Sequence, residues 1–291
     1  MNLRRRYFHE KMMVFLLIVA TLLVLVPLFI IIGHVVVNGI SGLNWNFFTQ
    51  DLGSPARAQQ GRPTGLAHSI IGTIIIDSMA LILAIPFGIG AGIMLSEYPD
   101  HPLTPSLRIL NDTFNGMPAI LKGLLAYALI VQPTGSFSGF AGSVALAFVM
   151  LPIIARATEG ILGIIPWSIR EAALALGLPR WRVVLSTTLP AARTGLVTGI
   201  IIAFARSAGE AAPLLFTSFG NNFLPRNPWN PLAYLTREAD TLPQRLYSLA
   251  ISPYREWHSM GWGAGIILLL FVIIAFALAR LTTRGSPDYR Q

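Results

Sequence analysis

The stretch from Arg170 to Phe216 decides the fold. It begins with the letters REAALALGLPRWR, continues through TTLP and ends in an apolar run that closes with FARSAGEAAPLLF. The first half is too polar to stay in lipid, whereas the second half is apolar enough for a membrane span and yet carries Arg206 and Glu210. The sequence therefore predicts a water-facing docking element, residues 166–190, that is joined directly to a span containing charge.

Local signals predict two short helices in the docking element, with a bend between them. Ser168 and Glu171 have the spacing of a capping box at a helix start. Gly177 suits the left-handed residue just past a helix end, and Pro179 suits the first turn of a second helix. The letters TTLP predict a turn before the span. From these signals alone, an ordinary cytoplasmic loop and a docking site for another protein both remain open.

The composition is that of a membrane protein. Hydrophobic residues make up 54% of the chain and charged residues only 12%, well below the ~25% that is usual in soluble domains. The absence of cysteine excludes a disulfide framework and a thiolate metal site. The net charge of +8 would suit a nucleic-acid partner, but the basic residues flank apolar runs, so we interpret them as topology signals.

Hydropathy predicts six membrane spans, at residues 12–37, 66–95, 117–131, 141–165, 194–216 and 262–281. Basic residues are concentrated in the N-terminal tail, the 95–116 loop, the docking element and the C-terminal tail, which the positive-inside rule assigns to the cytoplasm. Both termini and the docking element are therefore expected on the side of the membrane that contains ATP.

Pairs of glycines four residues apart occur in or beside three of these spans. They are Gly88 and Gly92, Gly195 and Gly199, and Gly261 and Gly265. Such spacing favours close packing of helix backbones in a membrane. Chance is the alternative in a chain with 26 glycines.

Ionisable residues lie in or at the edge of the predicted spans: Asp77, Lys122, Arg206 and Glu210. Each would cost about 2.5–3.5 kcal/mol at the centre of a membrane, so a functional role is the default interpretation. Lys122 lies near the cytoplasmic end of the third span, where its long side chain can snorkel to the interface. Asp77 can face the pathway, pair with Arg206 or stay protonated against its neighbours. His68, nearer the outer end of the same span, is interpreted as an interface residue.

The docking element resembles the EAA loop of ATP-binding-cassette (ABC) importer permeases. The matching residues are Glu171, Ala172, Ala173, Gly177, Leu189 and Pro190. In that family the loop inserts a coupling helix into a cleft of the ATPase subunit, so the resemblance implies a role in ATPase coupling for these residues. Thr187 departs from the family, which often has an aliphatic residue at that position.

Further stretches resemble the phosphate-specific subfamily, the PstA-type permeases. The clearest has the letters AGEAAPLLFT at residues 208–217, and others lie at 81–90, 96–98 and 252–257. The resemblance covers most of the chain from about Gly65 onward. Lys122 and Asp77 depart from it, because the subfamily tends to carry an aromatic or apolar residue at the first position and a small uncharged residue at the second.

The resemblance implies an all-α polytopic membrane protein with six transmembrane helices, the type I fold of ABC importer permeases, and both termini in the cytoplasm. Residues 1–291 would form a single permease domain. Its core would cover about 66–283, its coupling loop about 166–190, and residues 1–65 would supply an N-terminal span and an outer loop. The implied location is the cytoplasmic (inner) membrane of a bacterium or archaeon.

By the same resemblance, the chain would form half of the pathway of an ATP-driven phosphate importer. The implied partners are a homologous PstC-type permease, two PstB-type ATPase subunits and an external PstS-type phosphate-binding protein. ATP and magnesium would be bound by the ATPase subunits, and no cofactor, metal or catalytic residue is expected in this chain. The sequence contains no Walker-type P-loop and no HExxH or GxSxG motif.

Arg206 and Glu210, together with Asp77, are the predicted substrate pathway. Arg206 and Glu210 are four residues apart, so one continuous helix would place them on the same face. Arg206 would lie ~18 Å into the fifth span, near the middle of the bilayer. A guanidinium can match two phosphate oxygens and keeps its proton, and Glu210 would neutralise it when phosphate is absent. This pattern predicts a polar gate, and a static ion pair between spans is the alternative.

Three other functions remain open. A permease of the same superfamily could carry another oxyanion, such as sulfate or molybdate. An intramembrane enzyme could use Asp77 or Glu210 as an acid or base, but it would leave the docking element unexplained. A purely structural membrane protein is disfavoured by the charges inside the spans.

Overall fold

The computed structural model describes residues 3–283, and the elements in that range are helical. The α-helices are α1 (Leu3–Gly39), α2 (Trp45–Thr49), α3 (Pro55–Gln59), α4 (Ala67–Glu97), α5 (Thr104–Gly116), α6 (Ala119–Ala126), α7 (Gln132–Thr134), α8 (Gly139–Ile164), α9 (Trp167–Ala175), α10 (Arg180–Val183), α11 (Leu189–Ser207), α12 (Pro231–Leu235), α13 (Leu242–Ala250) and α14 (Arg255–Thr283). Short 3-10 turns are η1 (Ile40–Gly42) and η4 (Leu214–Phe216), and π-helical turns are η2 (Tyr127–Val131) and η3 (Val184–Thr188). The predicted all-α class is confirmed.

The number of spans agrees with the sequence prediction. Within residues 3–283, five helices are long and apolar enough to cross a membrane, and a sixth span results if one bent pair counts as a single span. That pair consists of α5 and Ala119–Thr134, which meet at an angle of 111°. The segment Ala119–Thr134 corresponds to the predicted span 117–131. The helix α5 was not predicted from the sequence. The orientation of the termini stays a prediction.

The fifth span differs from the prediction at both ends. Arg180–Ser207 is one continuous helical segment, so the turn predicted at TTLP is wrong. The π-helical turn η3 lies just before Pro190 and accommodates a residue that lacks an N–H donor, so the helix continues. At its other end α11 stops at Ser207, although the prediction ran to residue 216. Residues 208–213, which end in Pro213, form turns and irregular backbone instead of a continuation of the helix.

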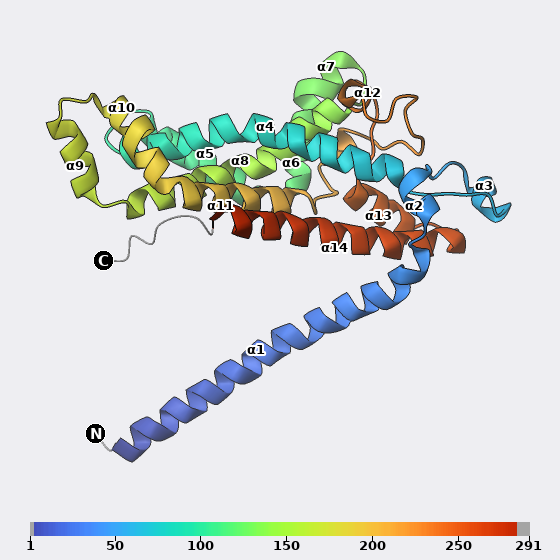
Figure 1. The fold of residues 1–291 in the computed structure, drawn as a ribbon, viewed down its shortest axis with the longest axis horizontal. Helices are drawn as coiled ribbons and strands as arrows, with labels where there is room; N and C mark the ends of the chain where they lie inside the picture. Colours follow the sequence, from blue (N-terminus) through green and yellow to red (C-terminus); the bar gives the residue numbers. More distant parts are fainter. Residues whose placement is uncertain (1–2, 284–291) are drawn as a thin grey trace.

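The centre of the bundle is formed by α4, α8 and α11, which run along the long axis of the molecule with α14 beside them (Figure 1). α4 packs most extensively against α8. Ile76 and Ala80 from α4, Met150 and Ile154 from α8, and Ala203 from α11 are buried in one apolar cluster. This cluster holds the three helices together, and α11 carries Arg206 at its end.

Glycines bring these helices into backbone contact. A Cβ atom at Gly92 of α4 would lie 2.4 Å from Cβ of Thr158, and one at Gly199 of α11 would lie 2.5 Å from Cβ of Ala157. Both contacts are too short for any side chain, so α8 packs directly against the backbones of α4 and α11. The close packing predicted from the glycine spacing is confirmed at these positions.

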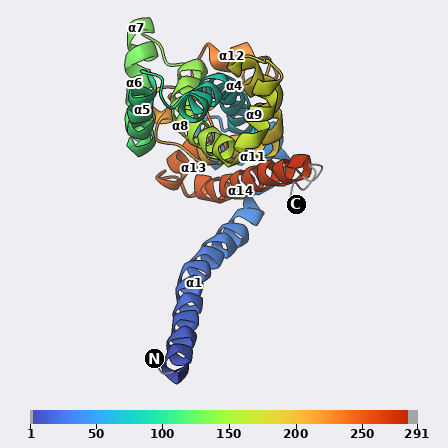
Figure 2. The same cartoon turned by 90° about the vertical axis from the view of Figure 1, so that its left-hand side faces the viewer.

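Helix α1 diverges from the rest of the molecule, as two views at right angles show (Figures 1 and 2). It meets α14 near its C-terminal end, where the rings of His34 and Trp262 form an edge contact at 5.0 Å between centroids. The most apolar part of α1 is not covered by any other residue in the range 3–283. Its surface therefore suits contact with lipid or with another membrane subunit.

Candidate functional site

The docking element projects from one end of the bundle, where α9 and α10 lie beyond the packed helices (Figure 1). Gly177 has a left-handed backbone with φ of +80°, and its N–H donates to the carbonyl of Leu174 at 2.9 Å. The bend predicted at Gly177 is confirmed. Pro179 directly precedes α10, instead of lying in its first turn, and has the extended backbone of a residue flanking a helix start.

The capping box predicted from Ser168 and Glu171 is wrong. α9 begins at Trp167, directly after Pro166, and Ser168 lies inside the first turn. Pro166 itself has the non-helical backbone that the flanking position needs, with φ of −56° and ψ of 137°, and no side chain caps the helix start. The proline therefore sets the boundary, and the helix starts two residues earlier than the capping box required.

The docking element presents an exposed apolar surface. Glu171 and Ala172 face solvent, Ala173 is turned inward, and Leu176 is 83% exposed. Exposed leucine and small alanine side chains on a helical loop are typical of a surface that a partner protein covers. Leu189 is different, since it packs against the cluster of Leu162, Ala192 and Leu196. The coupling role assigned to these residues stays a prediction.

A buried ion pair fixes the docking element to the bundle. Arg170 in α9 donates from Nε to both carboxylate oxygens of Glu97 at 3.1 Å, and from Nη2 to Oε1 at 2.6 Å. The same guanidinium donates to the carbonyl oxygens of Ile165 and Leu162, each at 2.7 Å. Arg170 therefore joins α9 to the ends of both α4 and α8.

Tyr98, the residue directly after α4, contacts the second docking helix. The guanidinium of Arg180 lies over the ring of Tyr98 at 5.0 Å from the centroid, in the geometry of a cation–π contact. Sequence reasoning did not identify these contacts. Residues 96–98 were noted only because they resemble the phosphate-specific subfamily. Arg170 and Arg180 were used only as basic residues that indicate the cytoplasmic side. The usable signal was a carboxylate at the end of an apolar span, on the same predicted side as an arginine next to Glu171.

We expect Glu97→Gln to destabilise the chain, because it leaves Arg170 buried without its counter-ion. Removing one partner of a buried ion pair costs about 3–5 kcal/mol. The measurement is the thermal midpoint of the purified chain in detergent, with Glu171→Gln as the control, since Glu171 is exposed. The expectation fails if Glu97→Gln and Glu171→Gln unfold at the same temperature as the unchanged chain.

A second site is a pocket of about 510 Å³ between the α5–α6 segment, α8 and the end of α11. We term it the pathway pocket. It is lined by the break between α5 and α6 at residues 115–119, by Val149 and Ile153 of α8, by Ile202, and by three charged residues. The charged residues are Lys122, Arg206 and Glu210. The structure therefore brings the two predicted gate residues together, and it adds a third charge.

Arg206 and Glu210 form an ion pair across the end of α11. Arg206 Nη2 lies 3.5 Å from Glu210 Oε1. The prediction that both lie on one helical face is wrong, because α11 ends at Ser207 and Glu210 follows in a turn. Arg206 occupies the last turn, where the helix dipole favours a positive charge. Its side chain is 64% exposed and Glu210's is 23% exposed, so the pair is open to the pocket.

The sequence suggested that the side chain of Lys122 snorkels to the membrane interface. The structure does not agree with this suggestion. Lys122 is only 5% exposed, and it lines the same pocket as Arg206. The bend of 111° between α5 and the segment that carries Lys122 turns this helix start into the bundle. Hydropathy reasoning placed Lys122 near a membrane surface because it assumed a straight span.

Asp77 does not line the pathway pocket. It is 1% exposed in the middle of α4, and it makes no ion pair with Arg206 or with any other residue in the range 3–283. Of the three alternatives drawn from the sequence, burial against its neighbours is the one that fits this position. Asp77 and Glu210 therefore do not line the same pocket.

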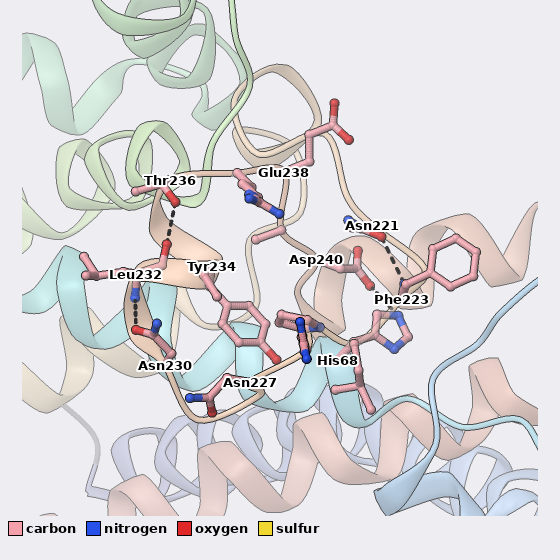
Figure 3. Close-up of a pocket in the computed structure, with 16 residues that line it drawn as sticks. His68, Asn221, Phe223, Asn227, Asn230, Leu232, Tyr234, Thr236, Glu238 and Asp240 are labelled. Atoms are coloured by element: carbon pink, nitrogen blue, oxygen red, sulfur yellow. Dashed lines mark hydrogen bonds and ion pairs between the residues drawn. The ribbon is translucent and has the colours of Figure 1, made fainter.

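A pocket of about 580 Å³ lies beside the 221–240 loop, with His68 from the start of α4 on its wall (Figure 3). Asp240 accepts from Arg245 Nε at 2.7 Å and from Ser69, and its Oδ2 lies 3.4 Å from His68 Nε2. Burial favours the neutral carboxyl, but Arg245 and His68 outweigh it and lower the pKa of Asp240. His68 is therefore a buried partner of Asp240, and the interface role predicted for it is wrong. These contacts tie the loop to α4 and α13.

The fold and the sites described above define a polytopic membrane protein with an exposed docking element at one end and a charged pocket within its bundle. The family model for the inner membrane component of binding-protein-dependent transport systems matches residues 84–285. Because this match covers more than half of the chain, the chain belongs to that family.

Comparison with individual proteins gives more specific similarities than the family model does. The chain is 38% identical over 245 residues to the phosphate transport system permease protein PstA of Xylella fastidiosa strain 9a5c, covering 84% of this chain and 81% of that protein. It is 35% identical to the PstA protein of Haemophilus influenzae, covering 94% and 93%. Among solved structures, the MetNI methionine ABC transporter in an inward-facing conformation aligns with a TM-score of 0.62 at 19% identity, covering 76% of this chain and 95% of that one. That likeness supports the type I permease fold.

Proposed function

We propose that the chain is the membrane-spanning permease subunit of an ATP-driven phosphate importer and forms half of its translocation pathway. Relatives at 35–38% identity that cover most of the chain bear the name of phosphate permeases. The structural observation that carries the proposal is Arg206. Its guanidinium lies within a bundle of apolar helices, 3.5 Å from Glu210, and is open to a pocket.

Arg206 suits the chemistry of phosphate transfer. Phosphate near neutral pH carries between one and two negative charges, as phosphate monoesters do. A guanidinium offers two parallel N–H donors to two oxygens and does not lose its proton. Glu210 holds Arg206 in a neutral pair when the pathway is empty, and phosphate takes its place when the pathway opens. The pair then acts as a gate that binds phosphate transiently.

The docking element supplies the connection to ATP. We assign coupling to Glu171, Ala172, Ala173 and Gly177 on the projecting segment, with Leu189 and Pro190 anchoring the start of α11. The ATPase subunits bind ATP and magnesium, and this chain hydrolyses nothing itself. Because Arg170 and Arg180 fix both docking helices to the end of α4, a movement of the ATPase surface would reach the bundle directly.

The proposed assembly contains a homologous PstC-type permease, two PstB-type ATPase subunits and an external PstS-type phosphate-binding protein. The chain acts in it as a single permease domain, in the cytoplasmic membrane of a bacterium or archaeon with both termini inside. The exposed apolar surface of α1 fits a position at the edge of such an assembly, toward lipid or the second permease.

The test is uptake of radiolabelled phosphate by cells that express the chain with its neighbouring subunits, in competition with sulfate and with molybdate. We expect excess unlabelled phosphate to abolish uptake, and sulfate and molybdate to leave it unchanged. Purification of the chain in mild detergent should recover an ATPase and a second permease. Uptake of labelled sulfate or molybdate in place of phosphate would contradict the proposal.

A further inference from the structure

Lys122 and Arg206 reach one pocket from two separate helices. Lys122 comes from α6 and Arg206 from the end of α11, and both line the pathway pocket. Lys122 is close enough to Arg206 and Glu210 to interact electrostatically with each. Since only 5% of Lys122 is exposed, water solvates its charge poorly.

The charges in the pathway pocket do not balance. Its charged residues are two cations, Lys122 and Arg206, and one anion, Glu210. Glu210 pairs with Arg206 at 3.5 Å, and no carboxylate in the range 3–283 lies within 4.0 Å of Lys122 Nζ. A buried charge that lacks a partner is destabilising, and the same holds within a membrane. With Lys122 protonated, the three charged side chains that line the pathway pocket sum to a net charge of +1.

The helix that carries Lys122 adds to this imbalance. α6 begins at Ala119, directly after Pro118, and both residues line the pocket. The N-terminus of a helix carries partial positive charge and attracts anions. Lys122 is the fourth residue of α6, at the end of its first turn, where a positive charge does not favour the helix. Helix stability therefore does not explain the position of Lys122.

We propose that the pathway pocket is a binding site for a tetrahedral oxyanion, with Lys122 as the second cation beside Arg206. The proposal rests on the function proposed above and names a further residue that recognises phosphate. Arg206 offers two parallel donors, Lys122 offers a compact charge with rotatable donors, and the start of α6 offers backbone dipoles. Two cations match an anion that carries up to two negative charges better than Arg206 alone does.

The absence of cysteine from the chain permits a direct test. We expect Lys122→Cys to assemble with its partner subunits and to lose about tenfold or more of phosphate uptake per complex, the usual size of a lost hydrogen bond to a charged group. Aminoethyl methanethiosulfonate then attaches an ammonium group through a disulfide, on a side chain about one bond longer than that of lysine. It should restore uptake, whereas the neutral methyl reagent and the negatively charged sulfonatoethyl reagent should not.

Two controls separate charge from other effects. Leu121→Cys lies beside Lys122 on α6 but outside the pocket lining, and the aminoethyl reagent should leave its uptake unchanged. The unchanged complex, treated in parallel, accounts for thiols on partner subunits. If Lys122→Cys does not assemble, Lys122→Met and Lys122→Arg replace it, and only the arginine variant should transport.

Two results would overturn the proposal. One is uptake by Lys122→Cys or Lys122→Met at the rate of the unchanged complex. The other is equal rescue by the methyl and aminoethyl reagents, which would show that volume matters and charge does not. An unchanged complex that takes up no phosphate would instead refute the proposed function and this site with it.

Discussion

Arg206→Gln is expected to give complexes that assemble in normal amounts and do not move phosphate. Glutamine keeps most of the side-chain length and polarity, but it loses the fixed charge and the paired donors. Loss of two charge-assisted hydrogen bonds to phosphate should lower uptake per complex on the order of a hundredfold or more. Glu210 remains, and it would then repel phosphate from the pathway pocket.

The measurement is uptake of labelled phosphate divided by the amount of complex recovered from the same membranes. Arg193→Gln is the matched control, because Arg193 lies on the same helix, is exposed and does not line the pocket. A static ion pair predicts the opposite pattern, with less complex recovered and near-normal uptake by what remains. That pattern would end the gate mechanism.

Gly177→Val is expected to produce a complex that inserts in the membrane but transports little or no phosphate. Gly177 has φ of +80° and no atom within 4 Å of the position where a Cβ would lie. The substitution therefore causes no collision, and its effect is purely conformational. A β-branched residue held in the left-handed region costs about 1–3 kcal/mol. The bend that presents α9 should open, and the ATPase should be released or uncoupled.

Two quantities test this expectation, namely phosphate uptake and the amount of ATPase that co-purifies with the chain. Gly163→Val is the control. Gly163 also has open space around it, but it lies in α8 without positive φ, so valine meets no backbone strain there. Normal uptake by Gly177→Val, with ATPase retained in full, would remove the main support for the coupling role.

The sequence was sufficient for the spans whose ends are set by local composition. α4 and α8 begin and end within two residues of the predictions 66–95 and 141–165, because their apolar runs are long and bounded by polar residues. It failed where neighbouring elements set the backbone. α11 ends before Pro213, and η3 carries the helix past Pro190, and neither outcome can be read from hydropathy.

The candidate site was predicted in part. Arg206 and Glu210 stood out because charge is rare in apolar runs, and the structure brings them together at 3.5 Å. Lys122 and the pair of Arg170 with Glu97 were missed, because their roles depend on contacts between residues far apart in the chain. The sharp bend before α6 moves Lys122 from an expected interface to the pathway pocket. Arg170 gains its importance only when α4 and α9 meet.

Phosphate import by the purified complex is the most direct measurement. The chain, its partner permease, the ATPase subunits and the external binding protein are reconstituted in proteoliposomes, and labelled phosphate is followed across the membrane with ATP present or absent on the docking-element side. We expect uptake that depends on ATP and saturates with phosphate. Excess sulfate should not reduce this uptake. Fully assembled complexes that carry Arg206→Gln should show none. Uptake of sulfate in place of phosphate, or undiminished phosphate uptake by the Arg206→Gln complex, would contradict a phosphate pathway through Arg206.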